Sequence, residues 1–498
     1  MDLSRWIERQ AAFTPEKTAI RFGEIDLSYA AFADRIERVT AILAALGVRR
    51  GDAAAFLGLN NPQMLAMLFA CARLGAMLMP LNWRLAPPEH AWMLTDCPPR
   101  ALFVEPEFVE HVNGFRTGLG GTRLVSLGAA PSGWLSWDEL FRCAPAVALR
   151  EGSDDSVVLL CYTSGTTGVP KGVMLTQRAL FWNAVNSTHL HDLTSADRVL
   201  TTLPLFHVGG LNIQTTPAFH AGASLVLHPK FDARAAIDAI QRERITLAVL
   251  VPAQLNAMME SPHWESADLS SLRMIVTGST IVPEAFVRKV GARGVPTVQV
   301  YGSTETCPIA SYVRAENWER KAGSAGLPAL HCELRVSDDS GCELPPGRDG
   351  EILVRGPSIM TGYWNAPEQT AQALKDGWYH TGDVGHLDED GYLYVVARKT
   401  ELIISGGENI YPAELEHILL QCPFIQEACV VGRPDERWGE IVVAAVVLKT
   451  GMPMSEADVM ALFQGRLARY KHPREVRFVS ALPRTALGKV QRNQVLKK

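Results

Sequence analysis

The spacing of apolar residues predicts a helix between Leu27 and Asp52, near the start of the chain. Apolar side chains recur there at steps of three and four: Phe32, Ile36, Val39, Leu43 and Leu46. That spacing places them together on one face of a helix. Gly47 follows the last of them, and glycine is a common residue just beyond a helix end.

Strands and helices then alternate along most of the chain. Short apolar runs predict strands, and longer runs with helical spacing predict helices. Strands are predicted at 53–59, 76–79, 157–161, 199–203, 247–251, 274–277 and 297–300, and helices at 62–74, 233–242 and 283–292. This alternation is typical of an α/β protein with parallel sheets.

The pattern changes after about Gly323, where short strands and turn residues dominate, as in DDSGCELPPGRDGEILVRG. This predicts a small β-rich subdomain. Beyond Arg398 a further group of elements is predicted, with helices at 413–420 and 455–467 and strands at 427–431 and 441–448. A piece of that size is large enough to be a separate α+β domain. We therefore expect a large N-terminal domain at 1–397 and a small C-terminal domain at 398–498.

Composition and charge exclude several classes of protein. The 498 residues are 47% hydrophobic and 20% charged with a net charge of −5, values typical of a folded globular protein. The sequence contains no basic cluster for nucleic acid and no apolar run long enough to span a membrane, and we expect that its N-terminus is not a secretory signal. Nine cysteines without a CxxC spacing indicate thiols in a reducing cytoplasm and argue against a zinc site.

The run YTSGTTGVPKGV, from Tyr162 to Val173, contains the residue types of a phosphate-binding loop. Its glycines, hydroxyls and single lysine lie between two apolar stretches, and backbone amides in such loops bind anions. The Walker pattern fails, because its sixth position, counted from Gly165 as the first, is Pro170 where that pattern requires glycine. A plain surface loop is the alternative interpretation.

Together with the motifs LPLFHVGG, VYGSTET, YHTGD and PRTALGKVQR, which follow in order along the chain, this run resembles the signature of the adenylate-forming superfamily. That superfamily includes acyl-CoA synthetases, luciferases and the adenylation domains of peptide synthetases. The resemblance implies an ATP site made by Thr163, Ser164, Gly165, Thr166, Thr167, Gly168, Lys171, Tyr301, Gly302, Ser303, Thr304, Asp383, Arg398 and Lys489.

Particular roles follow from the same resemblance. Tyr301 offers an aromatic face to a purine, and Glu305 offers a carboxylate oxygen to Mg²⁺. Asp383 would accept hydrogen bonds from the ribose. His207 would gate the acid, although a lone histidine is more often part of a core. The acyl pocket is expected at His207, Val208, Gly209, Gly278, Ser279 and Thr280.

The resemblance assigns two tasks to the C-terminal domain. Lys489 would neutralise the carboxylate and the α-phosphate during adenylation. A rotation about a hinge at Thr400 would then replace it by a surface for coenzyme A made of Ser405, Gly406, Gly407, Glu408, Trp438 and Arg474. Thr400 stands where the family usually has Lys or Asp, and its branched side chain has less backbone freedom.

A second departure from the family lies in the acyl pocket. Ser279 and Thr280 replace a Gly-Ala pair, which favours a short, aryl or otherwise compact acid.

The expected activity is an AMP-forming carboxylic acid:CoA ligase that uses ATP, Mg²⁺ and coenzyme A. A stand-alone enzyme that loads an acyl carrier protein is the alternative, and a luciferase-type oxygenase or a nucleotide sensor is less favoured. No aspartate lies in LFHVGG to pair with an α-ammonium, which argues against amino acids. The enzyme is expected to be cytoplasmic, with a homodimer as the oligomer to test.

Overall fold

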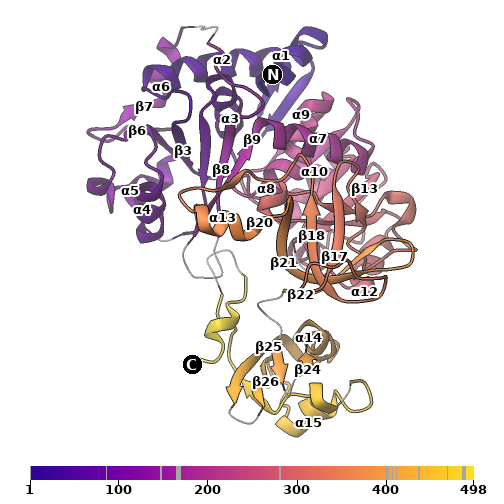
Figure 1. Cartoon of the computed structure of the whole chain (residues 1–498). Helices are drawn as coiled ribbons and strands as arrows, with labels where there is room; N and C mark the ends of the chain where they lie inside the picture. Colours follow the sequence, from indigo (N-terminus) through magenta and orange to yellow (C-terminus); the bar gives the residue numbers. More distant parts are fainter. Residues whose placement is uncertain are drawn as a thin grey trace. The chain divides into compact units, whose positions relative to one another are not determined.

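The computed structural model falls into two compact units, each considered by itself. One unit comprises Met1–Leu334, Leu353–His380 and Gly391–Leu393, and the other comprises Arg335–Ile352, Thr381–Asp390 and Tyr394–Lys498. The structure describes residues 2–85, 87–145, 149–163, 170–279, 282–398, 403–405, 408–410, 412–435, 438–467, 469–484 and 489–497. Figure 1 shows the chain with its elements labelled.

A nine-stranded sheet forms the centre of the first unit, in the order β16-β15-β14-β13-β12-β10-β11-β1-β2. Its strands are β1 (Thr18–Phe22), β2 (Ile25–Ser28), β10 (Arg198–Thr201), β11 (Ser224–Leu227), β12 (Leu247–Val249), β13 (Met274–Gly278), β14 (Thr297–Tyr301), β15 (Ser311–Tyr312) and β16 (Leu327–Pro328). The six strands from β14 to β1 are parallel, and the antiparallel pairs lie at the two edges. This confirms the predicted α/β class.

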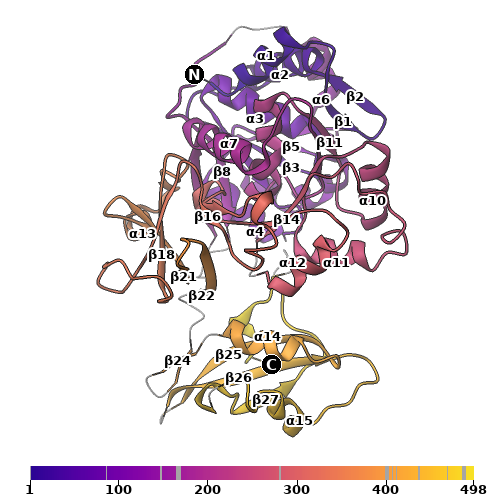
Figure 2. The same cartoon turned by 90° about the vertical axis from the view of Figure 1, so that its right-hand side faces the viewer.

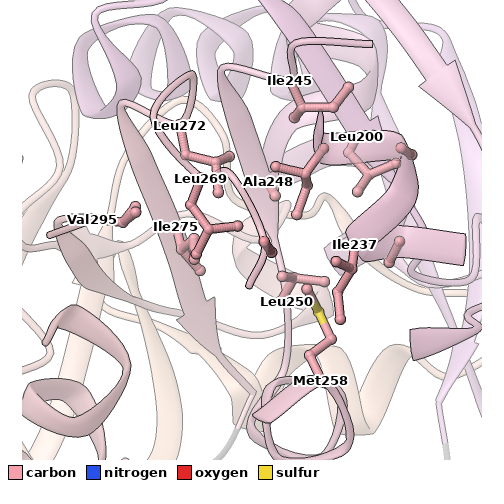
Figure 3. Packing of buried hydrophobic residues seen from close by; sticks show 14 of the residues in the cluster. Leu200, Ile237, Ile245, Ala248, Leu250, Met258, Leu269, Leu272, Ile275 and Val295 are labelled. Carbon is pink, nitrogen blue, oxygen red and sulfur yellow. The ribbon is translucent and has the colours of Figure 1, made fainter. Parts of the chain in front are cut away.

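One face of this sheet is covered by α10 (Ala233–Arg242), α11 (Pro252–Met259) and α12 (Glu284–Gly291), which Figure 2 shows along the same side of the unit. Leu200, Ala248 and Ile275 point from adjacent strands into the buried cluster beneath these helices, as Figure 3 shows. Because strand side chains alternate, Thr201, Val249 and Val276 lie on the opposite face.

That opposite face is covered by α7 (Gln177–His191) and by a continuous helical segment made of α8 (Val208–Gly210), η3 (Leu211–Thr215) and α9 (Thr216–Ala221). The five residues of η3 form a π-helical turn. Such turns are rare in proteins and frequently occur at functional sites.

A second sheet of eight strands has the order β19-β9-β8-β4-β3-β5-β6-β7. Its strands are β3 (Ala53–Leu57), β4 (Met77–Leu81), β5 (Ala101–Val104), β6 (Arg123–Ser126), β7 (Leu135–Ser136), β8 (Val157–Thr163), β9 (Lys171–Thr176) and β19 (Gly362–Tyr363). The helices α2 (Tyr29–Ala45) and α3 (Pro62–Leu74) form where the sequence predicts them, and they pack against each other. None of the helices in the described ranges has both the length and the hydrophobicity needed to cross a membrane.

The β-rich region predicted after Gly323 is confirmed as a third sheet, with the order β17-β18-β21-β20 and β22 beside β21. Its strands are β17 (Glu333–Ser337), β18 (Gly350–Arg355), β20 (Leu374–Lys375), β21 (Trp378–Leu387) and β22 (Leu393–Arg398).

The second unit contains a sheet with the order β24-β23-β26-β25 and β27 beside β26. Its strands are β23 (Ile403–Ser405), β24 (Glu408–Ile410), β25 (Ile425–Asp435), β26 (Gly439–Leu448) and β27 (Glu475–Phe478). The helix α14 (Pro412–Leu420) and Val459 of α15 (Glu456–Ala461) pack into one core beside it.

The prediction of a helix at 455–467 is wrong in its length, because α15 ends at Ala461. The chain continues in turns from Leu462, and the left-handed φ of 70° at Gly465 keeps the helix from resuming before Leu467.

Candidate active site

The predicted phosphate loop connects two antiparallel strands of the eight-stranded sheet. In the register of β8 and β9, Thr163 lies opposite Lys171. These two residues are therefore held side by side at the strand ends, where the loop leaves and returns. Ser164, Gly165, Thr166, Thr167 and Gly168 lie outside the described residues.

Three residues meet beside this hairpin, and two of them, Lys171 and Glu305, were predicted from the sequence. The Lys171 Nζ lies 5.2 Å from the centroid of the Tyr363 ring, and the Tyr363 hydroxyl donates a hydrogen bond of 2.9 Å to Glu305 Oε1. Tyr363 comes from β19, which pairs with β9. The structure thus brings the lysine of the loop and the candidate Mg²⁺ carboxylate together through one tyrosine.

Glu305 is held by the turn that follows β14. It lies in the 3₁₀ helix η4 (Thr304–Thr306), and its carbonyl accepts a 2.8 Å hydrogen bond from the amide of Met360. Gly302 makes this turn possible, because a Cβ there would lie 1.6 Å from the carbonyl oxygen of Pro308. The Ser303 amide donates to the Thr306 hydroxyl at 2.9 Å.

A second tyrosine, Tyr379 of β21, lies against the same turn. The Ser303 hydroxyl donates to the Tyr379 hydroxyl at 3.4 Å. Burial, together with the negative charge of Glu305, raises the pKa of the Tyr379 phenol well above its usual value. The phenol therefore stays protonated and neutral beside the carboxylate. One partly exposed carboxylate and a nearby lysine suit a Mg²⁺ that also binds phosphate oxygens.

His207 precedes the helical segment α8–η3–α9 and packs against an aromatic and a cationic neighbour. The rings of Phe206 and His207 have centroids 4.6 Å apart, and the guanidinium of Arg84 lies 5.7 Å from the Phe206 centroid. Burial, and then the positive charge of Arg84, lower the pKa of His207 to about 4. The imidazole is therefore neutral at physiological pH.

The other predicted acyl-pocket residues lie in two segments of the same unit. Val208 is buried in α8, and Gly209 beside it has room for a side chain, since an added Cβ would meet only Ile213 at 4.0 Å. At the end of β13, a Cβ on Gly278 would lie 2.5 Å from the Val300 carbonyl oxygen. Ser279 follows with a left-handed φ of 69°. Thr280 lies outside the described residues.

Three further residues predicted to bind ATP lie on β14, on β21 and at the end of β22. Tyr301 is the last residue of β14. Asp383 is buried in β21, with its amide donating 3.0 Å to the Thr381 hydroxyl. Arg398 ends β22, and its side chain, like Thr400, lies outside the described residues.

Three residues predicted to bind coenzyme A are brought together in the second unit. Ser405 of β23 pairs with Gly439, the first residue of β26 and the neighbour of Trp438. The Arg474 guanidinium lies 4.2 Å from the Trp438 ring centroid, a cation–π geometry. Glu408 begins β24 opposite Ser405, while Gly406 and Gly407 lie outside the described residues.

Lys489 is exposed, in a C-terminal segment that is anchored on both sides of it. Before it, Arg484 forms an isolated β-bridge with Val490. After it, the Arg492 guanidinium donates to both carboxylate oxygens of Glu416, at 2.5 and 2.8 Å. A bidentate ion pair of this kind fixes geometry as well as charge.

Sequence reasoning missed Tyr363 and Arg84. Tyr363 lies in a two-residue strand with no motif around it, and only the pairing of β19 with β9 carries it to Lys171. Arg84 lies in a turn after β4, where a single arginine gives no signal.

Comparisons with known proteins identify the family to which the chain is similar. The family model described as AMP-binding enzyme matches residues 7–364, and that described as AMP-binding enzyme C-terminal domain matches residues 414–489. The chain is 59% identical to indoleacetate–CoA ligase of Aromatoleum aromaticum, over 99% of this chain and 98% of that protein. It is 42% identical to feruloyl-CoA synthase of an Amycolatopsis species, over 99% and 98%.

Solved structures show the same similarity. The o-succinylbenzoate CoA synthetase of Bacillus subtilis, in complex with its acyl-adenylate intermediate, aligns with a TM-score of 0.89 at 34% identity, over 99% of this chain and 97% of that one. A second structure of that enzyme contains ATP and a magnesium ion, with the same TM-score and identity and 98% of each chain covered.

Proposed function

The chain belongs to the AMP-binding enzyme family, and we propose that the acid it activates is an aryl acid, with an aromatic ring on a short carboxylic arm. The reaction class is that of an ATP-dependent acid:CoA ligase. The acid carboxylate displaces pyrophosphate from ATP to give an acyl-AMP, and the thiol of coenzyme A then displaces AMP to give the thioester. ATP, Mg²⁺ and coenzyme A are its co-reactants.

The first step joins two anions, so its barrier is largely electrostatic. Two like charges ~4 Å apart repel by several kcal/mol at an effective dielectric near 20. Lys171 would supply a fixed positive charge at the mouth of the loop. Glu305 would hold Mg²⁺, which supplies further positive charge to the phosphates when it is bound, and Tyr363 would orient that carboxylate. The junction of Lys171, Tyr363 and Glu305 is the observation that carries this assignment.

The aryl acid is supported by the relatives and by the pocket residues. The relative at 59% identity acts on indoleacetate by its name, and the one at 42% on ferulate. Gly209 and Gly278 contribute no side chain, and the ring of Phe206 lies beside His207. Ligand pockets are lined mainly by apolar and aromatic side chains, which suits an acid with an aromatic ring.

The roles of the C-terminal residues are proposals of the same kind. Lys489 would act in adenylation, and Ser405, Trp438 and Arg474 would contact coenzyme A after a rotation about Thr400. The domain division at 397/398, a homodimer and a cytoplasmic location also remain proposals. Carrier-protein loading is the weaker alternative, because these relatives are CoA ligases.

A panel of acids tests the proposal. Pyrophosphate release is followed with ATP, Mg²⁺ and indole-3-acetate, phenylacetate, ferulate, octanoate or palmitate, with and without coenzyme A. We expect continuous turnover that needs coenzyme A, with the arylacetates best in kcat/KM. A preference for octanoate or palmitate would overturn the aryl assignment. Release that stops after one equivalent unless a carrier protein is added would favour carrier loading.

A further inference from the structure

The π-helical turn that follows His207 contains a buried polar side chain that has no hydrogen-bond partner among the described residues. Gln214 is 2% exposed, and neither its amide oxygen nor its amide nitrogen has a hydrogen-bond partner within the part of the chain that the structure describes. Leaving a buried amide without partners is costly, so such groups are rare in folded proteins. A buried amide in this state is expected to have a partner that arrives from outside.

The polar neighbours of Gln214 on the same turn are all engaged within the protein. The carbonyl of Asn212 accepts a 2.6 Å hydrogen bond from the Asn183 amide, and the Asn212 side-chain oxygen accepts from the Thr216 hydroxyl at 3.1 Å. The Thr215 hydroxyl contacts the Thr201 hydroxyl at 2.8 Å. The lack of partners is therefore specific to Gln214 and is not a general property of the turn.

The turn lies over the sheet face on which the acyl-pocket residues are placed. The contact of Thr215 with Thr201 fixes the turn at the C-terminal end of β10. On that face the neighbouring strands carry Val249 and Val276, and Gly278 ends β13, two strands from β10. Val208 and Gly209 of the predicted pocket entrance precede Gln214 in the same helical segment, and His207 lies just before that segment.

We propose that Gln214 is a specificity-determining residue that accepts a hydrogen bond from the aromatic ring system of the acid. The ligand chemistry is a ring-borne donor, either the N–H of a heterocycle or the O–H of a phenol. This rests on the proposed function, since the acid must carry a ring. A site built around such a bond discriminates strongly against an analogue that lacks the donor, because the protein amide is then left buried and unpaired.

Pairs of acids with similar ring shapes, of which only one carries a hydrogen-bond donor, distinguish the effect of the hydrogen bond from that of ring shape. In the first pair, 1-benzothiophene-3-acetate has a sulfur atom where indole-3-acetate has the ring N–H. In the second pair, 4-fluorophenylacetate has a fluorine atom where 4-hydroxyphenylacetate has the O–H. In the wild type we expect kcat/KM for thioester formation to favour one donor-bearing acid over its partner by about tenfold or more. The pair that shows the preference identifies the donor. A wild type without preference in either pair overturns the proposal.

The variant Gln214→Leu is expected to abolish the preference, bringing the two acids of the pair within about twofold of each other. A preference unchanged in Gln214→Leu overturns the proposal. The control is Gln254→Leu, which removes a buried amide from α11 on the other face of the sheet. Gln254 is 8% exposed, but its amide nitrogen donates to the Thr202 hydroxyl at 3.5 Å. We expect this control to keep the wild-type preference.

The melting temperature gives a second readout. If the role of Gln214 were only structural, its replacement would lower the melting temperature. Without ligand, Gln214→Leu should melt at or above the wild-type temperature, because it removes an unpaired amide, whereas Gln254→Leu should melt lower. A fall in the melting temperature of Gln214→Leu, with the acid preference retained, would make Gln214 structural. If the wild type activates no arylacetate at all, the proposed function fails instead.

Discussion

At the scale of single residues, removing the Tyr363 hydroxyl tests whether its hydrogen bond orients Glu305. Tyr363→Phe keeps the ring beside Lys171 and removes only the donor of the 2.9 Å hydrogen bond. We expect the Mg²⁺ concentration for half-maximal pyrophosphate release to rise about tenfold, since a hydrogen bond to a charged group contributes roughly 1.5 kcal/mol.

Glu305→Gln is the companion variant, because it removes the carboxylate itself and should lower adenylation more than Tyr363→Phe does. An unchanged Mg²⁺ dependence in Tyr363→Phe would show that the tyrosine does not serve the metal site.

The lowered pKa of His207 predicts how thioester formation depends on pH. Its pKa is lowered to about 4 by burial and by Arg84, so the neutral imidazole persists down to mildly acidic pH. Arg84→Met removes the second cause and should move the pKa of His207 upward, towards the usual value of about 6.5. Thioester formation from supplied acyl-AMP should therefore begin to fall at a higher pH in the variant than in the wild type as the solution is acidified.

The measurement is a pH profile of the thiol step, together with an NMR titration of the His207 ring. His207→Gln, which cannot titrate, serves as the control and should lose this acid limb. Identical acid limbs in wild type and Arg84→Met would rule out the coupling between the two side chains.

At the scale of the element, two adjacent glycines in α8 differ in whether the surrounding structure has room for a side chain. A Cβ on Gly210 would lie 2.3 Å from the Pro204 carbonyl oxygen, whereas one on Gly209 would meet only Ile213 at 4.0 Å. Gly210→Ala should therefore destabilise the protein by about 1–3 kcal/mol, the usual cost of overpacking.

Gly209→Ala should leave the melting temperature near that of the wild type and should instead change the relative kcat/KM of bulky and slender acids. Thermal denaturation and the acid panel measure both effects. Equal stability of the two variants would contradict the packing described for α8.

The boundaries of several elements could be predicted because local residues fix them. The helix α3 begins after Asn61, whose side chain accepts from the Gln63 amide, and it ends at Gly75 with a left-handed φ of 67°. The predicted 62–74 matches these bounds. Local sequence could not predict the π-helical turn Leu211–Thr215, because side-chain contacts with α7 and β10 hold its backbone.

At the scale of the whole molecule, the proposed role of Lys489 predicts different effects on the two half-reactions. Lys489→Ala should lower pyrophosphate release by about 10²–10³-fold, the effect expected for removing one group that stabilises developing charge. Thioester formation from supplied acyl-AMP and coenzyme A should stay near the wild-type rate.

Lys497→Ala removes another exposed lysine of the same C-terminal segment and should leave both steps unchanged. An equal loss of both steps in Lys489→Ala would contradict this division of labour.

The residues of the candidate site that lie in contiguous motifs could be predicted from the sequence. The residues that connect these motifs in space could not. The run around Lys171 and the run around Glu305 each carry a recognisable motif. Tyr363, which connects them, depends on the pairing of β19 with β9, a long-range contact that one sequence does not reveal. The same holds for Arg84, whose effect on His207 is an electrostatic interaction through space.

The hairpin of β8 and β9 has a practical consequence for engineering. Since Thr163 and Lys171 are locked face to face by the strand register, the residues between them can be exchanged with those of a relative as a single cassette. Such a transplant keeps its two anchor points as long as its length is conserved. A lengthened or shortened insert would have to slip the strands, and a slip by one position would turn their inward side chains outward.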